Sequence, residues 1–282
     1  MSYGPNPWQQ AHWDWRAAGN FIFGGAGSGL LVFTVASGLQ GVAARLLVLT
    51  GLALVGLGLL CVWLEIGRPL RAANVFINLR LSWMSREALA SVFVFACGLG
   101  LAAGVQACAA PLAVVALAFL YCQARIVQGA RGIPAWREPL IVPLLVACGL
   151  AEGAGLFWLL GAWQVPAHAA ASGLFAVLVA VRWALWRTWR KRLGDAQIAP
   201  RALAHVDRIA PVVQWIGGAL ALALALLAAG GLAPESWNPA LLAAAGLAVA
   251  VSGARFKFTL ITRAAFNQGF ALARLPVRGV PR

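Results

Sequence analysis

The sequence predicts an all-α, polytopic membrane protein with eight transmembrane helices and both termini in the cytoplasm. Of its 282 residues, 62% are hydrophobic and only 11% are charged. A soluble domain has about 45–50% apolar and about 25% charged residues. Eight separate apolar stretches also occur, each close to the roughly 20 residues that a helix needs to cross a bilayer. These observations exclude a soluble enzyme, a disordered chain and a disulfide-stabilised domain.

The chain begins with a polar, Trp-rich segment. Residues 1–17 lack the basic start and short apolar core of a secretory signal. We expect them to form an interfacial leader, because Trp rings favour the membrane–water interface. The membrane domain, 18–262, follows, with spans expected at 18–39, 45–64, 87–107, 111–128, 139–161, 167–187, 210–231 and 239–262. A basic tail, 263–282, ends the chain.

Turn-forming residues mark several boundaries between these spans. Gly67-Arg68-Pro69 closes the second span, Pro111 opens the fourth, Gly132-Ile133-Pro134 separates the fourth from the fifth, and Asn238-Pro239 opens the eighth. The segment of about 70–82 is too polar to cross a membrane, but its apolar residues recur at near-helical spacing. We therefore predict a short amphipathic helix on the membrane face, with Ser82 as a candidate cap for the third span.

The basic residues predict the orientation of the chain. The leader, the tail and the loops after the second, fourth and sixth spans fall on one side, and with the adjacent span ends they hold every Lys and Arg except Arg45. This assignment places Arg182 and Lys257 at span ends and leaves no arginine near the midplane. By the positive-inside rule this side is the cytoplasm, which points to the inner (plasma) membrane of a bacterium. These cations either serve only to set the topology and to contact anionic lipid, or they also form a docking surface for a partner protein. Nucleic acid is excluded as a partner.

The sequence lacks the usual ligands for redox cofactors within the bilayer. His12 is in the leader, His168 is at the outer mouth of the sixth span, and His205 is in a basic loop, so no pair of histidines can hold an internal haem. The five cysteines lie in apolar stretches without any Cys-x-x-Cys pair, which excludes a thiolate-bound cluster or zinc site. We expect neither haem nor metal in this chain.

Two carboxylates are expected to converge at the inner membrane boundary. Glu65 ends the second span and Glu87 begins the third, with Arg68, Arg71 and Arg86 nearby. An acid at this depth is costly unless it is paired, so a purely structural pairing with one of these arginines is one interpretation. The other is proton transfer to a membrane-soluble substrate, because burial and a neighbouring charge together tune a carboxylate for that role.

Further candidates lie on the first, fourth and fifth spans. The glycine-rich stretch 24–29 in the first span predicts either close helix packing or a groove for a flat ligand. Asn20, which precedes this stretch, either caps a helix or faces that groove. Tyr121 and Arg125 share a helix face and either snorkel to the interface or bind a quinone carbonyl. Glu152 lies deep in the fifth span, as a proton-path residue or a buried structural acid.

Several of these segments resemble a known family. The HWDW leader, the glycine-rich first span, the LEIGRPLRA block at 64–72 and the SWMSREAL block at 82–89 resemble the membrane-anchor subunits of complex iron–sulfur molybdoenzymes, the DmsC/NrfD-like family of DMSO and polysulfide reductases. The resemblance is strongest from about 8 to 90. The sulfite-oxidising and phenylacetyl-CoA:acceptor oxidoreductase branches look most similar.

The resemblance implies a haem-free subunit that exchanges electrons between a membrane quinone (ubiquinone or menaquinone) and a partner iron–sulfur subunit, which is joined to a molybdopterin subunit. Relatives often carry His where Glu65 stands, which keeps a titratable group but leaves its role open, whereas Glu87 matches the family's acid. Asn20 and Tyr121 match quinone-contacting positions loosely. The predicted quinone pocket is lined by Asn20, Arg68, Arg71, Trp83, Tyr121 and Arg125, with Glu65 and Glu87 as proton-transfer groups.

Two other functions remain open. One is a proton-coupled secondary transporter of an organic anion, with Glu152 as the coupling acid. Such a transporter predicts an internal repeat, and the sequence shows no clear one. The other is a purely structural anchor without a quinone site.

Overall fold

A computed structural model describes residues 7–66, 69–161, 169–196 and 198–269. The predicted all-α class is confirmed, because eight helices in these ranges are long and apolar enough to cross a membrane. The first seven elements are α1 (Trp15–Gly19), η1 (Asn20–Gly24), α2 (Gly25–Ala36), α3 (Gly41–Glu65), η2 (Pro69–Asn78), α4 (Trp83–Ala102) and η3 (Gln106–Cys108). They are followed by α5 (Ala109–Gly129), α6 (Pro134–Arg137), α7 (Ile141–Gly161), α8 (Ala169–Asp195), α9 (Pro200–Pro211), η4 (Val212–Leu220), α10 (Ala221–Ala229), η5 (Glu235–Trp237) and α11 (Asn238–Thr262).

Several short elements join into longer spans. The first span consists of α1, η1 and α2, and the seventh consists of α9, η4 and α10. Within them η1 and η4 are π-helical, which widens the helix by one residue per turn. The predicted amphipathic helix is present as η2, a 3-10 helix.

Two of the spans that begin earlier than their apolar stretches indicate have a clear local cause. The third begins at Trp83 rather than residue 87, because Ser82 caps it: the Ser82 hydroxyl accepts a hydrogen bond from the Ser85 backbone N–H at 3.3 Å. The seventh begins at Pro200 rather than residue 210, because α9 is amphipathic. Its buried face carries Val206 and Ile209 and packs onto the bundle, while its charged face stays exposed.

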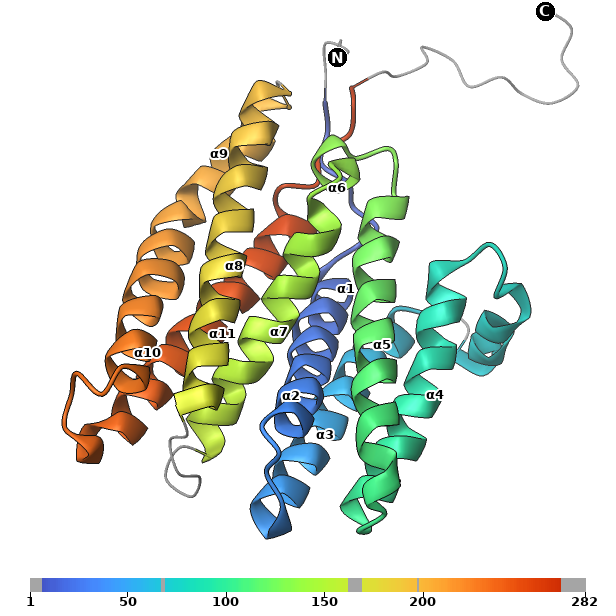
Figure 1. Ribbon diagram of the computed structural model, residues 1–282. Helices are drawn as coiled ribbons and strands as arrows, with labels where there is room; N and C mark the ends of the chain where they lie inside the picture. Colours follow the sequence, from blue (N-terminus) through green and yellow to red (C-terminus); the bar gives the residue numbers. More distant parts are fainter. Residues whose placement is uncertain (1–6, 67–68, 162–168, 197, 270–282) are drawn as a thin grey trace, which may run out of the picture.

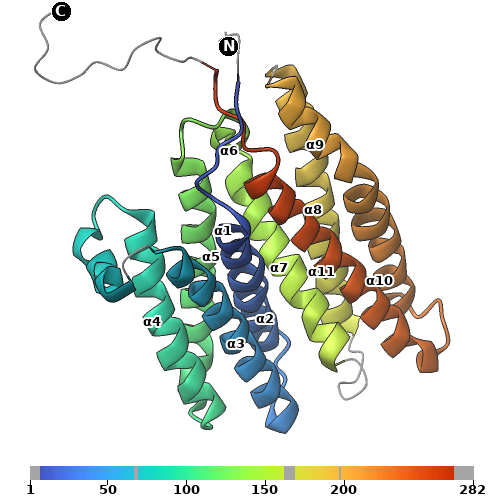
Figure 2. The ribbon, with the colours of Figure 1, turned by 180° about the vertical axis from the view of Figure 1, so that it is seen from behind.

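The spans run up and down, so that successive connections alternate between two ends of the bundle (Figure 1). We call the end where α1 begins and α11 finishes the basic end, and the end that holds the turns from α2 to α3 and from α4 to α5 the opposite end. The spans that contain α2 and α7 form the centre of the bundle. In these two spans 78% and 72% of an apolar 18-residue stretch is buried, compared with 33–39% in the other spans. In Figures 1 and 2, α3, α4 and α5 flank this pair on one side, and α8, α10 and α11 on the other.

Glycines allow the central helices to approach each other closely. A Cβ atom at Gly29 of α2 would overlap the backbone of Gly149 of α7, and one at Gly153 would overlap the backbone of Gly29. Small residues at such a contact let helix backbones meet in lipid. The packing interpretation of the glycine-rich first span is therefore confirmed.

The leader is bound to the far end of the chain. The Gln10 N–H donates to the Ala265 carbonyl at 2.9 Å, and the Asn267 N–H donates to the Trp8 carbonyl at 3.0 Å. The Trp13 ring stacks on Trp136 of α6, with ring centroids 4.8 Å apart. The first and last described segments therefore lie side by side across the basic end (Figure 2).

Candidate functional site

A cavity of about 170 Å³ at the basic end brings together three of the predicted site residues. It lies between the leader, the first span, α3, α4 and α5. Its polar lining consists of Asn20, Glu65 and Glu87, and its apolar lining consists of Trp13, Ala17, Phe21, Val62, Ile66, Met84 and Ile126. We call it the carboxylate cavity.

Asn20 and Glu87 are joined across two helices in this cavity. The Asn20 amide donates to Glu87 Oε1 at 3.0 Å, and the two side chains are only 3% and 5% exposed. Asn20 is the first residue of the π-helical segment η1. Single π turns inside α-helices are frequent at functional sites, because they change the direction of one side chain without ending the helix.

Gln123 of α5 supports Asn20 from behind. Its amide donates to the Asn20 backbone carbonyl at 3.0 Å, and the residue is buried. Sequence reasoning missed this residue, although a glutamine inside the apolar stretch 111–128 was a usable signal. Asn20 Oδ1 makes no hydrogen bond within the described part of the chain and is buried beside Gly24 and Gly58.

Glu87 is not paired with the neighbouring arginine. The Arg86 guanidinium donates to the backbone carbonyls of Leu79 and Arg80 at 2.9 and 2.8 Å and lies over the Trp83 ring. Adjacent residues point about 100° apart around a helix, so Arg86 faces the turn before α4 while Glu87 faces the bundle. Among the described residues no cation forms an ion pair with Glu87. The structural pairing with Arg86 is therefore wrong.

Glu65 lines the same cavity from the last turn of α3 and is half-buried. In the ranges covered by the structure its carboxylate has no ion pair within 4.0 Å. Arg16 is engaged elsewhere: it pairs with Asp14 at 2.9 Å and donates to the Leu64 carbonyl at 2.8 Å. The hydrogen bond from Arg16 lowers the pKa of the Asp14 carboxyl. Arg68 lies outside the described residues, and Arg71 is placed only by its backbone, in η2.

Trp83, Tyr121 and Arg125 form a separate cluster on the surface of α4 and α5. Arg125 donates to the Tyr121 hydroxyl at 2.9 Å and lies 4.6 Å from the Trp83 ring centroid, and Tyr121 is 41% exposed. None of the three lines the carboxylate cavity. Tyr121 precedes the lining residue Ile126 by five positions, which rotates it by about 140° around the helix. The prediction that these three share one pocket with Asn20 is therefore wrong.

Glu152 forms a buried ion pair with Lys257. Lys257 Nζ lies 2.8 Å from Glu152 Oε2, and the two side chains are 2% and 1% exposed. Lys257 is expected at the cytoplasmic end of the span 239–262, whereas its side chain is buried in the core, where α11 packs on α7. The pair joins α7 to α11, and sequence reasoning did not identify it.

An arginine also lies inside the bundle, contrary to expectation. Arg182, in the middle of α8, is 2% exposed and donates to the Val249 carbonyl at 2.9 Å and to the Ser252 hydroxyl at 2.6 Å. These two acceptors on α11 satisfy the guanidinium locally. The expectation that Arg182 lies at the cytoplasmic end of its span is therefore not met, because its side chain is buried between α8 and α11.

Buried polar groups continue from the carboxylate cavity toward this ion pair. Gln123 and Lys257 both approach Gly25, since a Cβ atom there would lie 3.5 Å from Gln123 Oε1 and 2.6 Å from Lys257 Nζ. Both residues line a small cavity of about 10 Å³, which is near the lower limit for one water molecule. We call Glu87, Asn20, Gln123, Lys257 and Glu152 the polar row.

Comparison with known proteins adds no further assignment. No protein-family model matches the chain, and no curated protein matches it. The carboxylate cavity and the polar row are therefore the features of the described residues that point to a function.

Proposed function

We propose that the carboxylate cavity binds the ring of a membrane quinone, and that the chain is the membrane-anchor subunit of an oxidoreductase complex. The observation that carries the proposal is the Glu87 carboxyl group. It is buried in an apolar-walled cavity and held by the Asn20 amide, without a cation in the described residues. A carboxyl group in such a place suits proton exchange with an apolar ligand more than it suits structural support.

The size and walls of the cavity suit a quinone ring. Its volume of about 170 Å³ is similar to that of the engineered apolar cavity of about 150 Å³ that binds benzene. Trp13, Phe21 and Met84 supply broad apolar surface on the ring's faces. Asn20 and Glu87 form a polar edge on this largely apolar lining.

Glu87 and Glu65 divide the proton chemistry between them. Oxidation of a quinol releases two electrons and two protons, and reduction of a quinone takes up the same number. Glu87, which is buried, is the group that contacts the ring, and Glu65, which is half-buried, exchanges protons with water at the basic end. The chain supplies the site and the proton groups, while the redox metals belong to its partners.

The basic end provides a docking surface for such a partner. Exposed cations gather there around three connections and just after the last helix: Arg80, Arg131, Lys191, Arg201, Arg208 and Arg263. Charge complementarity speeds association and orients partners more than it adds affinity. Following the resemblance, we assign this face to a ferredoxin-like iron–sulfur subunit that connects to a molybdopterin subunit in the cytoplasm. The same assignment places the chain in the inner membrane, with both termini cytoplasmic.

Direct binding tests the proposal. The chain, purified in lipid nanodiscs, is titrated with short-chain ubiquinone and short-chain menaquinone by calorimetry. We expect one site per chain, a tenfold or larger loss of affinity in Glu87→Gln, and no change in Glu235→Gln. Glu235 serves as a matched control because it is an exposed carboxylate at the opposite end.

Each rival function predicts a different result. A structural anchor binds neither quinone but still co-purifies with an iron–sulfur protein. A transporter is isolated without such a protein and takes up an organic anion into proteoliposomes under a proton gradient. Unchanged quinone affinity in Glu87→Gln contradicts the role that we give to this carboxyl.

A further inference from the structure

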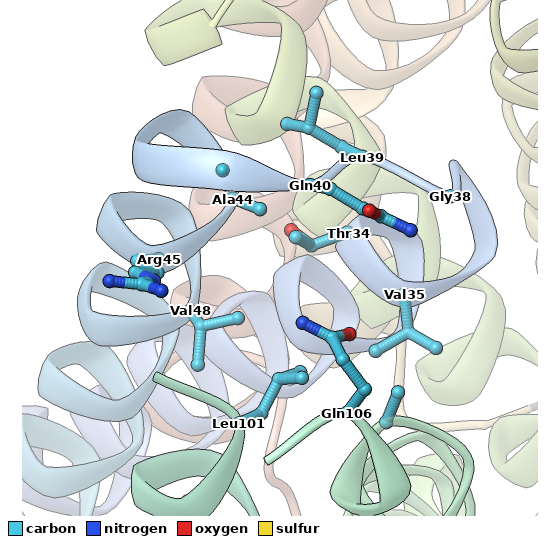
Figure 3. Close-up of a pocket in the computed structure, with 12 residues that line it drawn as sticks. Thr34, Val35, Gly38, Leu39, Gln40, Ala44, Arg45, Val48, Leu101 and Gln106 are labelled. Carbon is cyan, nitrogen blue, oxygen red and sulfur yellow. The ribbon is translucent and has the colours of Figure 1, made fainter. Parts of the chain in front are cut away.

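A second cavity, of about 220 Å³, lies at the opposite end of the bundle. It is formed where the turn from α2 to α3 meets the turn from α4 to α5. Its polar lining includes Thr34, Gln40, Arg45 and Gln106, and Val48 and Leu101 form part of its apolar wall (Figure 3). The proposed quinone chemistry does not use this site.

The cavity combines a cation with a helix N-terminus. Among the described residues Arg45 is the only Lys or Arg at this end of the bundle, and it makes no hydrogen bond or ion pair there that would neutralise it. Glycines with positive φ, Gly38 at 67° and Gly41 at 83°, turn the chain sharply into α3. This helix of 25 residues starts without a side-chain cap. Its first N–H groups therefore remain available to an anion, which the helix dipole also favours.

A buried hydroxyl at the same place also lacks a partner. Thr34 is 2% exposed and lines the cavity, and its Oγ1 makes no hydrogen bond within the described ranges. A buried polar atom without a partner is costly, so its position against a cavity points to a ligand. The amides of Gln40 and Gln106 add further donors.

The lining selects an anion over a quinone. It contains donors and a permanent cation but neither a carboxylate nor a histidine. A quinol at this place would have no group to accept its protons. A phosphate group instead matches a guanidinium, free helix N–H groups and a hydroxyl donor.

Exposed apolar residues beside Arg45 indicate that this phosphate belongs to a lipid. Val42, Leu46 and Leu49 lie within one turn of Arg45 on α3 and are all exposed. This outer surface of α3 can contact acyl chains while Arg45 binds the headgroup. We propose that this cavity binds the phosphate of an anionic phospholipid from the adjacent leaflet, with Arg45 as its main anchor.

Native mass spectrometry of the delipidated chain in detergent tests the proposal. Three probes are added in turn: dioleoyl phosphatidylglycerol, dioleoylglycerol and inorganic phosphate. We expect the wild type to retain one phosphatidylglycerol and to bind each of the other two at least tenfold more weakly. Arg45→Met should lose at least tenfold in affinity for the phospholipid. Arg201→Met should lose nothing, because it removes an exposed arginine at the basic end.

A second variant covers the case in which Arg45→Met fails to fold. Thr34→Val keeps the shape of the side chain and removes the unpartnered hydroxyl, so we expect a threefold to tenfold loss of phospholipid affinity. Equal binding of dioleoylglycerol, or equal binding of inorganic phosphate, overturns the assignment to a lipid phosphate. Displacement of the phospholipid by a short-chain quinone, or unchanged affinity in both variants, overturns the site itself.

Discussion

Lys257 donates a hydrogen bond to Glu152 at 2.8 Å, between α11 and α7, with both side chains almost fully buried. Each charge at this depth depends on the other, because neither can be solvated by water. Removing one partner of a buried pair leaves an uncompensated charge and typically costs about 3–5 kcal/mol, whereas removing both is often nearly neutral. The stability of the contact between α7 and α11 is therefore sensitive to the loss of either partner.

Lys257→Met should destabilise the protein by about 3–5 kcal/mol, and the double variant Glu152→Gln with Lys257→Met should recover most of that loss. Thermal unfolding in detergent, followed by circular dichroism, measures both. Arg255→Met is a suitable control, because Arg255 is an exposed cation on the same helix. A double variant as unstable as the single one contradicts the ion-pair explanation.

Gly29→Leu should prevent the close approach of α2 to α7. A Cβ atom at Gly29 would already overlap the backbone of Gly149, so the helices must separate and lose their contact. Overpacking of this kind costs about 1–3 kcal/mol or more. The yield of monodisperse protein in size-exclusion chromatography measures the effect.

Gly173→Leu provides the matched control for that substitution. Gly173 lies in α8, and a Cβ atom there meets nothing within 4 Å. We expect a normal yield for this variant. A normal yield for Gly29→Leu as well would show that the central contact tolerates a larger separation.

Gln123→Leu should weaken quinone binding in the proposed site by about threefold to tenfold. The substitution removes the donor to the Asn20 carbonyl, and a lost buried hydrogen bond costs about 1 kcal/mol or more. The calorimetric titration of the purified chain measures the change. Gln128→Leu, five residues later on the same helix and outside the carboxylate cavity, should bind normally; equal losses in both variants would argue against a specific role for Gln123.

Asp14 gives a pH-dependent contribution to the start of α1. Its carboxylate accepts from the Arg16 N–H at 2.8 Å as the helix cap, and Asp14→Ala should cost about 1 kcal/mol of stability at neutral pH. The folded-state pKa lies below the ordinary 3.8, so this contribution is present above pH 3.8 and falls as the pH drops through the folded-state pKa. Urea unfolding of both proteins from pH 7 to pH 2.5 should show the difference shrinking, while Asp14→Asn, which can cap the helix but carries no charge, should show a difference from Asp14→Ala that does not change with pH.

Hydropathy was enough to predict the number of spans, because each lipid-crossing helix must be apolar along about 20 residues. It misplaced the starts at Trp83 and Pro200, since a cap and an amphipathic extension carry those helices beyond the apolar stretch. Asn20, Glu65 and Glu87 were identified by their polar character at a membrane boundary, and they do meet in one cavity. Helix spacing alone did not separate Tyr121 from them, because the rotation of α5 is set by its neighbours.

Contacts between distant helices were beyond the reach of the sequence. Lys257 was assigned to the cytoplasmic end of the eighth span together with the other cations on that side, yet it turns inward to Glu152. Arg182 was assigned to a span end, yet Ser252 and the Val249 carbonyl hold it within the bundle. Both depend on which faces of α7, α8 and α11 pack together, and hydropathy does not specify that choice.

The attachment of the leader to residues 265–267 also sets the order in which the protein matures. Trp13, one wall of the carboxylate cavity, follows a segment that hydrogen-bonds to Ala265 and Asn267. Those residues leave the ribosome only after the eighth helix. A nascent chain thus carries Asn20, Glu65 and Glu87 in the membrane before the segment that leads to Trp13 can pair with residues 265–267.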